Sequence, residues 1–247
     1  MRATMRKKAG PVLAALSLIV VILLILVVGK KIEAYIPSEE VQELTEYFGT
    51  EHADDVAIVW SQQLTALKGK WMDGRVYLDF DTLHDELNGR FYWDGNEKLL
   101  RYTTADDLVT VYADREDFFI GNDVTKESYR IVQVMDDTVY VALDFVKQYT
   151  DLGYELYTDP YRILLTTDWD SICGRTTVRK KTQLRVKGGI KSPILKELAK
   201  GDEVAVLERM DDWCKVQTAD GIIGYVKNKK LTGEGKTAEL AEEQIPP

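Results

Sequence analysis

Hydrophobic and polar positions divide the chain into one long apolar segment and a series of short alternating ones. Residues 11–29 are nineteen consecutive positions without a charge, and they follow the basic residues Arg2, Arg6, Lys7 and Lys8. A helix of this length, at about 1.5 Å per residue, nearly covers the ~30 Å hydrocarbon core of a bilayer. The segment is longer than the apolar part of most signal peptides, and no small-residue cleavage site follows it. We therefore predict a transmembrane signal anchor at 11–29, with a cleaved signal peptide as the alternative.

The basic residues that flank this segment predict its orientation. Four precede it, whereas Lys30 and Lys31 follow it. The more basic flank of a membrane span usually stays in the cytoplasm. We expect residues 1–10 to be a cytoplasmic basic N-terminus and the chain after residue 29 to lie outside the membrane. The predicted localisation is the cell membrane, as a single-pass protein with extracytoplasmic C-terminal domains.

Residues 30–54 are predicted to form a juxtamembrane helix and a linker. The sequence PSEE, from Pro37 to Glu40, is typical of a helix start. The side chain of Ser38 can cap free amide groups, and the glutamates favour the positive end of the helix dipole. We expect this helix to reach about Tyr47.

From residue 55 onward the pattern changes to strands. Val56, Ile58 and Trp60 occupy alternate positions, and Asp73-Gly74 separates two apolar runs, which is a strong hairpin signal. The hairpin recurs 63 residues later, followed again by a short helix and a second hairpin. The identical pairs at this offset are Met72 and Met135, Asp73 and Asp136, Val76 and Val139, Tyr77 and Tyr140, Asp81 and Asp144, Thr103 and Thr166, and Thr104 and Thr167. We expect residues 55–170 to form a domain of two such repeats.

Residues 174–232 are predicted to form a small β-barrel, followed by a polar tail at 233–247. Short apolar runs alternate with turns here, and Gly201 and Gly221 stand where a turn disfavours residues with a Cβ. Four valines alternate as a barrel interior requires, namely Val204, Val206, Val216 and Val226. The predicted fold class is therefore mainly β with short helices: an α+β stalk repeat and a small barrel, behind one N-terminal transmembrane helix.

Both segments resemble known bacterial domains. Each repeat has a strand ending in an apolar residue, an aspartate near the start of a short helix, then an aromatic residue, an acidic turn and a β run. This resembles the copper amine oxidase N-terminal-like domain over about residues 55–168. That resemblance implies a stalk or spacer without copper chemistry.

In the barrel, the L-x-V strand, the K-G-D turn and the runs W-x-K-V and D-G-x-x-G-Y-V resemble a bacterial SH3 domain. This resemblance implies binding of cell-wall peptide or glycan. The order of anchor, stalk and SH3-like domain resembles the N-terminal region of membrane-anchored glycoside hydrolase family 18 proteins of Gram-positive bacteria. In those proteins a catalytic barrel follows.

Charge is distributed unevenly along the chain. Residues 38–170 carry a net charge of -18, whereas residues 174–232 carry +7. This distribution argues against nucleic acid as the main partner and leaves an anionic polymer as a candidate for the basic module. The alternative is that surface charge only keeps the domains soluble.

Trp213 and Tyr225 are the candidate ligand-binding residues. Each lies beside a turn, where a half-exposed ring can stack on a sugar or a peptide. The alternative is that both rings only close the mouth of the barrel.

The sequence contains no catalytic constellation and no cofactor motif. Asp79, Asp81 and Glu86 resemble paired carboxylates of glycoside hydrolysis. However, Asp81 recurs as Asp144 at the start of the equivalent helix, so we interpret Asp81 as a helix cap.

The histidines and cysteines predict neither a metal site nor a disulfide scaffold. His52 and His84 are the two histidines, and they are far apart in sequence. Cys173 and Cys214 are the two cysteines, which we expect to be free thiols. One disulfide between them in an oxidising space is the alternative.

These observations favour a non-catalytic wall-binding protein. The span anchors the chain, the acidic stalk spaces the barrel from the bilayer, and the SH3-like module engages peptidoglycan or an associated polymer. The alternative is the non-catalytic half of a chitinase-like family 18 hydrolase whose barrel lies beyond this chain. An interaction hub that uses exposed β edges is a third interpretation. The wall ligand and the oligomeric state stay open.

Overall fold

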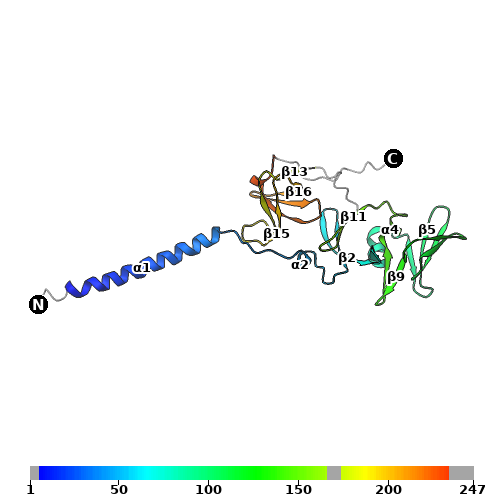
Figure 1. Ribbon diagram of the computed structural model, residues 1–247, viewed down its shortest axis with the longest axis horizontal. Coiled ribbons are helices and arrows are strands. Elements are labelled where there is room, and N and C mark those ends of the chain that lie inside the picture. Colours follow the sequence, from blue (N-terminus) through cyan, green and yellow to red (C-terminus); the bar gives the residue numbers. More distant parts are fainter. Residues whose placement is uncertain (1–5, 166–173, 234–247) are drawn as a thin grey trace.

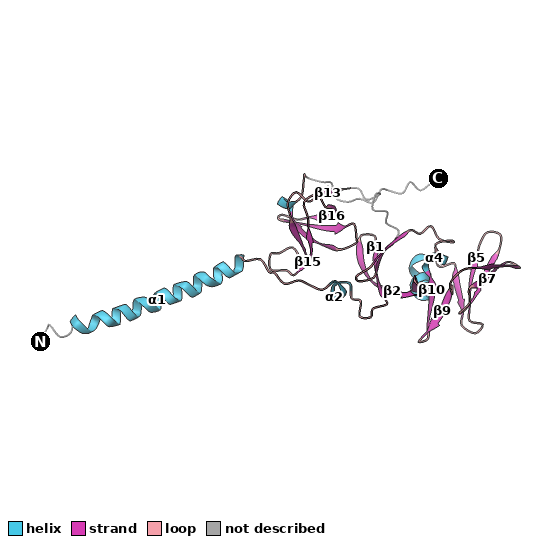
Figure 2. Cartoon of the chain, in the orientation of Figure 1, coloured by secondary structure: helices cyan, strands magenta, loops and turns pink. Residues whose placement is uncertain are grey.

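The molecule is elongated, with a helix at one end and three β-sheets following it. A computed structural model describes residues 6–165 and 174–233. Along the long axis, α1 (Arg6–Tyr35) comes first, a six-stranded barrel lies next to its end, a seven-stranded sheet follows, and a five-stranded sheet lies farthest away (Figure 1). Beyond α1, the described part is mainly β, with few short helices (Figure 2).

Helix α1 is continuous over 30 residues. Its side chains at positions 14–29 are all exposed. Within the part of the chain that the structure describes, no helix combines the length and the apolar content needed to cross a membrane.

The predicted helix start at Ser38 is wrong. Helix α2 begins at Leu44 and ends at Phe48, and residues 37–42, here called the strap, run in extended form beside the barrel. The backbone amide of Ile194 donates to the carbonyl of Glu40 (2.8 Å), and the amide of Gln42 donates to the carbonyl of Ile194 (2.9 Å). The strap forms these bonds because they satisfy backbone groups that the edge strand would otherwise leave unpaired.

The seven-stranded sheet contains the first hairpin of each repeat. Its order is β11-β12-β1-β2-β3-β10-β9. The equivalent strands β3 and β10 are antiparallel neighbours, with Leu78 opposite Val141, so a pseudo-twofold axis passes between the two units. The strands are β1 (Asp55–Trp60), β2 (Gln63–Met72), β3 (Arg75–Asp79), β9 (Val132–Met135), β10 (Thr138–Ala142), β11 (Tyr154–Tyr157) and β12 (Arg162–Leu165).

Both of these hairpins have turns with positive φ at their two central residues. The φ values are 50° and 75° at Asp73 and Gly74, and 47° and 62° at Asp136 and Asp137. Two-residue turns of this kind match the right-handed twist of the flanking strands. These two-residue turns therefore set the register of each hairpin.

A five-stranded meander and short helices complete this domain. One buried hydrophobic cluster joins both sheets and the helices, so they form a single core. The meander consists of β4 (Phe91–Asp94), β5 (Leu99–Thr103), β6 (Leu108–Tyr112), β7 (Asp117–Ile120) and β8 (Asp123–Lys126), and the helices are α3 (Phe80–Thr82), the π-helix η1 (Leu83–Leu87) and α4 (Leu143–Val146).

The barrel forms from the C-terminal strands in the order β13-β16-β17-β18-β14-β15. The four valines predicted to face its interior are fully buried, which confirms that prediction. The elements are β13 (Arg175–Thr177), β14 (Thr182–Arg185), β15 (Ile194–Leu198), β16 (Glu203–Arg209), β17 (Trp213–Thr218), β18 (Ile223–Lys227) and the 3-10 helix η3 (Asn228–Lys230).

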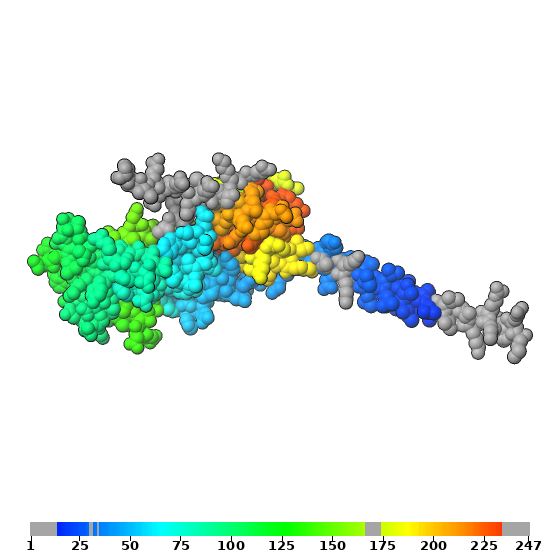
Figure 3. Space-filling view, turned by 180° about the vertical axis from the view of Figure 1, so that it is seen from behind, coloured from blue at the N-terminus to red at the C-terminus, as the bar shows by residue number. Residues whose placement is uncertain are grey.

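The barrel packs directly on the seven-stranded sheet, as the adjoining orange and cyan surfaces in Figure 3 show. Arg162 on β12, only 4% exposed, donates from Nε to the carbonyl of Asp220 (2.6 Å) and pairs with its carboxylate (3.0 Å). Lys196 binds the same carboxylate at 2.8 Å. A Cβ at Gly221 would lie 2.5 Å from a methyl carbon of Leu164, so this turn requires glycine.

This packing changes the expected arrangement of the two domains. The barrel, and not the acidic domain, lies next to the end of α1 (Figure 1). The amide of Ser38 donates to the carbonyl of Ile190 (2.7 Å), and Lys191 Nζ donates to the carbonyl of Glu33 (2.5 Å). The expectation that the acidic domain spaces the barrel from the end of the helix is therefore wrong.

Candidate functional site

Trp213 and Tyr225 lie on adjacent strands of the barrel and on the same face. In the antiparallel pair β17–β18, Trp213 is opposite Lys227 and Tyr225 is opposite Lys215, so the two rings are diagonal neighbours. Both are half-buried. Gly188 lies against them, because a Cβ at that position would be 3.4 Å from Trp213 Cγ and 3.5 Å from Tyr225 Cδ1.

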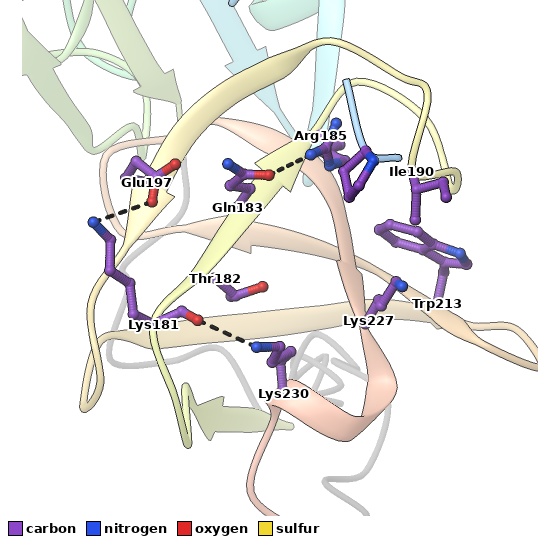
Figure 4. A pocket seen from close by; sticks show the side chains of 10 residues that line it. Lys181, Thr182, Gln183, Arg185, Ile190, Glu197, Trp213, Lys227 and Lys230 are labelled. Atoms are coloured by element: carbon purple, nitrogen blue, oxygen red, sulfur yellow. Dashed lines mark hydrogen bonds and ion pairs between the residues drawn. The ribbon is translucent and has the colours of Figure 1, made fainter. Parts of the chain in front are cut away.

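A pocket of about 370 Å³ opens beside Trp213, between the strap, β14 and the end of β18 (Figure 4). Tyr225 is not among the residues that line it, so the structure assigns only one of the two predicted rings to the pocket wall. The pocket is lined by Pro37, Lys181, Thr182, Gln183, Arg185, Ile190, Glu197, Trp213, Lys227 and Lys230.

Lysine side chains dominate the electrostatics of this pocket. Lys227 Nζ lies 5.6 Å from the centre of the Trp213 ring, at a distance that allows a cation–π interaction. Lys181 pairs with Glu197, the one acidic lining residue, at 3.5 Å. Among the described residues, neither Lys227 nor Lys230 has an acidic partner within salt-bridge distance. Lys230 Nζ donates a hydrogen bond to the carbonyl of Lys181 (3.4 Å), and among the described residues neither ammonium group is neutralised by a carboxylate.

Arg185 has a structural role at the floor of the pocket. Its side chain is buried and donates to the carbonyls of Ser192 and Ser38 and to the side-chain oxygen of Gln183. Burial lowers the pKa of its guanidinium from the ordinary value, and the charge of Glu197 opposes this shift. Arg185 holds the strap and the loop after β14 together, so its charge is already used within the protein.

Sequence reasoning missed most of the lining residues. The sequence could have identified Lys227, since this residue lies two positions after Tyr225 on the same strand and therefore shares its face. Pro37 had no comparable signal in the sequence, because it lies far from Lys227 in sequence and reaches the pocket only through the strap.

The three candidate carboxylates have different surroundings in the structure. Asp79 is the N-cap of α3, and its carboxylate accepts hydrogen bonds from Thr82 N (2.8 Å) and Thr82 Oγ1 (2.7 Å). Asp81 and Glu86 are exposed. The interpretation of Asp81 as the cap is therefore wrong, because the helix starts at Phe80 and the capping position precedes it.

Asp144, the equivalent of Asp81 in the second unit, does not cap a helix either. It forms an ion pair with Arg75 and accepts a hydrogen bond from the hydroxyl of Tyr154 (2.7 Å). Its carboxylate thus links the two repeat units.

The thiol of Cys214 lies in the barrel core. It is buried, and its Sγ donates to Asn228 Oδ1 at 2.7 Å. Burial raises the pKa of this thiol and disfavours the reactive thiolate. Cys173, like most of the predicted tail at 233–247, lies outside the described residues, so the predicted thiol states stay a prediction.

Comparison with known protein families identifies both domains. Residues 180–232 match the family model of the bacterial SH3 domain, and residues 61–161 match that of the copper amine oxidase N-terminal domain. The chain thus joins a bacterial SH3 domain to a copper amine oxidase N-terminal domain. No curated protein and no solved structure matches it. The predicted link to glycoside hydrolase family 18 stays a prediction.

The residues do not fit the metal that the second family's name contains. His84 Nδ1 lies 2.8 Å from the carbonyl of Phe91, and its ring stacks on Phe80. His52 is exposed. Across residues 6–165 and 174–233, no three His, Cys, Asp or Glu side chains are placed to hold a metal ion.

Proposed function

We propose that this protein is a membrane-anchored, extracytoplasmic binding protein whose SH3 domain attaches to a cell-wall polymer. The observation that carries the proposal is a pocket with an indole wall and lysine ammonium groups, in a domain that matches the bacterial SH3 family. A flat ring beside charged donors suits a sugar or peptide ligand with polar substituents.

Membrane anchoring is supported by the sequence of α1. Residues 11–29 carry no charge, and the side chains at 14–29 are exposed on the surface of a continuous helix. Exposed apolar surface of this extent is unfavourable in water and favourable in lipid. The basic residues before the segment support a cytoplasmic N-terminus.

Binding is tested with the full chain in nanodiscs and purified cell-wall sacculi. Trp213→Ala is expected to weaken binding by on the order of 1–3 kcal/mol, as the loss of an aromatic anchor does. Tyr92→Ala is the control, because Tyr92 is an exposed aromatic residue on the distant β4. The absence of sacculus binding by the unmodified protein, or equal binding by Trp213→Ala, would contradict the proposal.

Topology is tested separately in intact protoplasts. An externally added protease is expected to digest the domains after residue 38 and leave the α1 segment. Full protection of the domains would overturn the proposed orientation.

A further inference from the structure

The strap restricts the kind of ligand that the SH3 pocket can take. An extended peptide commonly binds by adding a strand to an exposed sheet edge. Here Val41 of the strap already pairs in parallel with Ile194 of β15, and the flanking bonds to Glu40 and Gln42 use the backbone groups of Ile194. This end of the β15 edge is therefore closed to an added peptide strand, and a ligand in the pocket cannot pair with the backbone of Ile194.

The side chains that line the pocket combine several cations with one aromatic face. Lys181, Lys227 and Lys230 line the pocket together with one acid, Glu197, which is already paired with Lys181. In Figure 4, Lys227 and Trp213 lie on the same side of the pocket, with Lys230 at its lower rim. An ammonium group beside an indole ring suits a repeating unit that carries both a phosphate and a sugar or polyol.

We propose that this pocket binds a phosphodiester-linked polymer of sugar or polyol units, with phosphate groups at Lys227 and at Lys230 and a neighbouring unit against Trp213. This inference rests on the proposed wall-binding function and names the ligand class for the same pocket. Pro37 lines the pocket only two positions after the end of α1 at Tyr35. With α1 in the bilayer, the pocket would meet the stretch of polymer nearest the membrane surface.

The test compares two preparations of sacculi, one untreated and one stripped of phosphodiester-linked polymers by aqueous hydrofluoric acid. The full chain in phosphatidylcholine nanodiscs is expected to bind the untreated sacculi at least roughly tenfold more tightly, which corresponds to about 1.4 kcal/mol. Glycerol 3-phosphate should compete for the pocket.

The variant Lys227→Gln/Lys230→Gln is expected to lose this preference. Lys200→Gln/Lys229→Gln is the matched control, because it removes the same charge from exposed positions of the same domain that do not line the pocket. The control should retain the preference, and a folded barrel in both variants is checked by near-ultraviolet circular dichroism.

The outcomes separate this inference from the proposed function. Equal binding to both preparations, with weaker binding by Trp213→Ala, would overturn the phosphate assignment and leave wall binding intact. Binding to neither preparation would overturn both. The protein could instead bind preferentially to phosphatidylcholine vesicles that contain phosphatidylglycerol and show no preference among sacculi. This result would assign the lysines to lipid headgroups and overturn the polymer as the ligand. Equal loss of binding in the control variant would attribute the effect to general surface charge. This result would overturn the assignment of the phosphate-binding site to the pocket.

Discussion

The two repeat units, whose first identical residues are Met72 and Met135, share their order of elements but use equivalent positions differently. Strands β3 and β10 pair around the pseudo-twofold axis, and both hairpins turn through two residues with positive φ. The backbone pattern is thus nearly symmetric. The side chains that stabilise each unit are not.

The helix starts illustrate this difference. Asp79 caps α3 in the first unit, whereas the equivalent position in the second unit is Ala142, which makes no side-chain cap. Asp81 is exposed, whereas its equivalent Asp144 binds Arg75 and Tyr154. An identical residue at an identical position therefore does not imply an identical role.

The last strands of the units differ in what covers them. Leu99 on β5 and Arg162 on β12 are equivalent and both buried. Leu99 lies within the meander, where β5 pairs with β4 and β6. Arg162 contacts the SH3 domain through Asp220. The last strand of the second unit therefore forms a docking surface for the SH3 domain, whereas the last strand of the first unit is part of the five-stranded sheet.

The largest effect is expected at the docking surface. Arg162→Ala should lower the free energy of unfolding by about 2–4 kcal/mol, because it leaves the partly buried carboxylate of Asp220 with Lys196 as its one remaining ion-pair partner among the described residues. Chemical denaturation measures this loss. A double-mutant cycle with Asp220→Ala isolates the pair, and a coupling energy near zero would contradict the assigned contact.

The dependence of stability on acidic pH tests the same contact between the two domains. Burial alone would raise the pKa of Asp220, but hydrogen bonds from Lys196 and Thr218 and the charges of Lys196 and Arg162 hold it below its ordinary value. A lowered carboxyl pKa stabilises the fold above the unfolded-state pKa of about 3.9, and this contribution disappears as the pH falls through the folded-state pKa. We expect Asp220→Asn to reduce the dependence of stability on pH in this acidic window. Unfolding curves at a series of acidic pH values measure it, and unchanged pH dependence would argue against Asp220.

A smaller effect is expected at the link between the units. Asp144→Ala should cost about 1–2 kcal/mol, since Arg75 and Tyr154 both lose their partner in a partly exposed site. Asp144→Asn serves as the control, because it keeps an acceptor for the Tyr154 hydroxyl and removes the charge. Equal stability of wild type and Asp144→Ala would show that the link contributes nothing measurable.

The smallest effects distinguish the two aspartates near α3. Asp79→Ala should cost about 1 kcal/mol, as the loss of a helix N-cap does, whereas Asp81→Ala should change stability by less than about 0.5 kcal/mol, as exposed positions usually do. Thermal unfolding of both variants measures the difference. A larger loss in Asp81→Ala would restore the original interpretation of the cap.

The sequence alone determined the features that depend on neighbouring residues. The burial of Val204 and Val206, the Asp-Gly turn at Asp73 and the presence of an SH3 domain follow from local patterns. Only the tertiary structure decided which partner each polar residue meets. The segment that follows Ser38 pairs with Ile194 of β15 instead of starting a helix, and Arg162 meets Asp220 across two domains. Backbone hydrogen bonds and ion pairs can be formed with any suitably placed partner, and that placement depends on how distant segments pack, which no local pattern encodes.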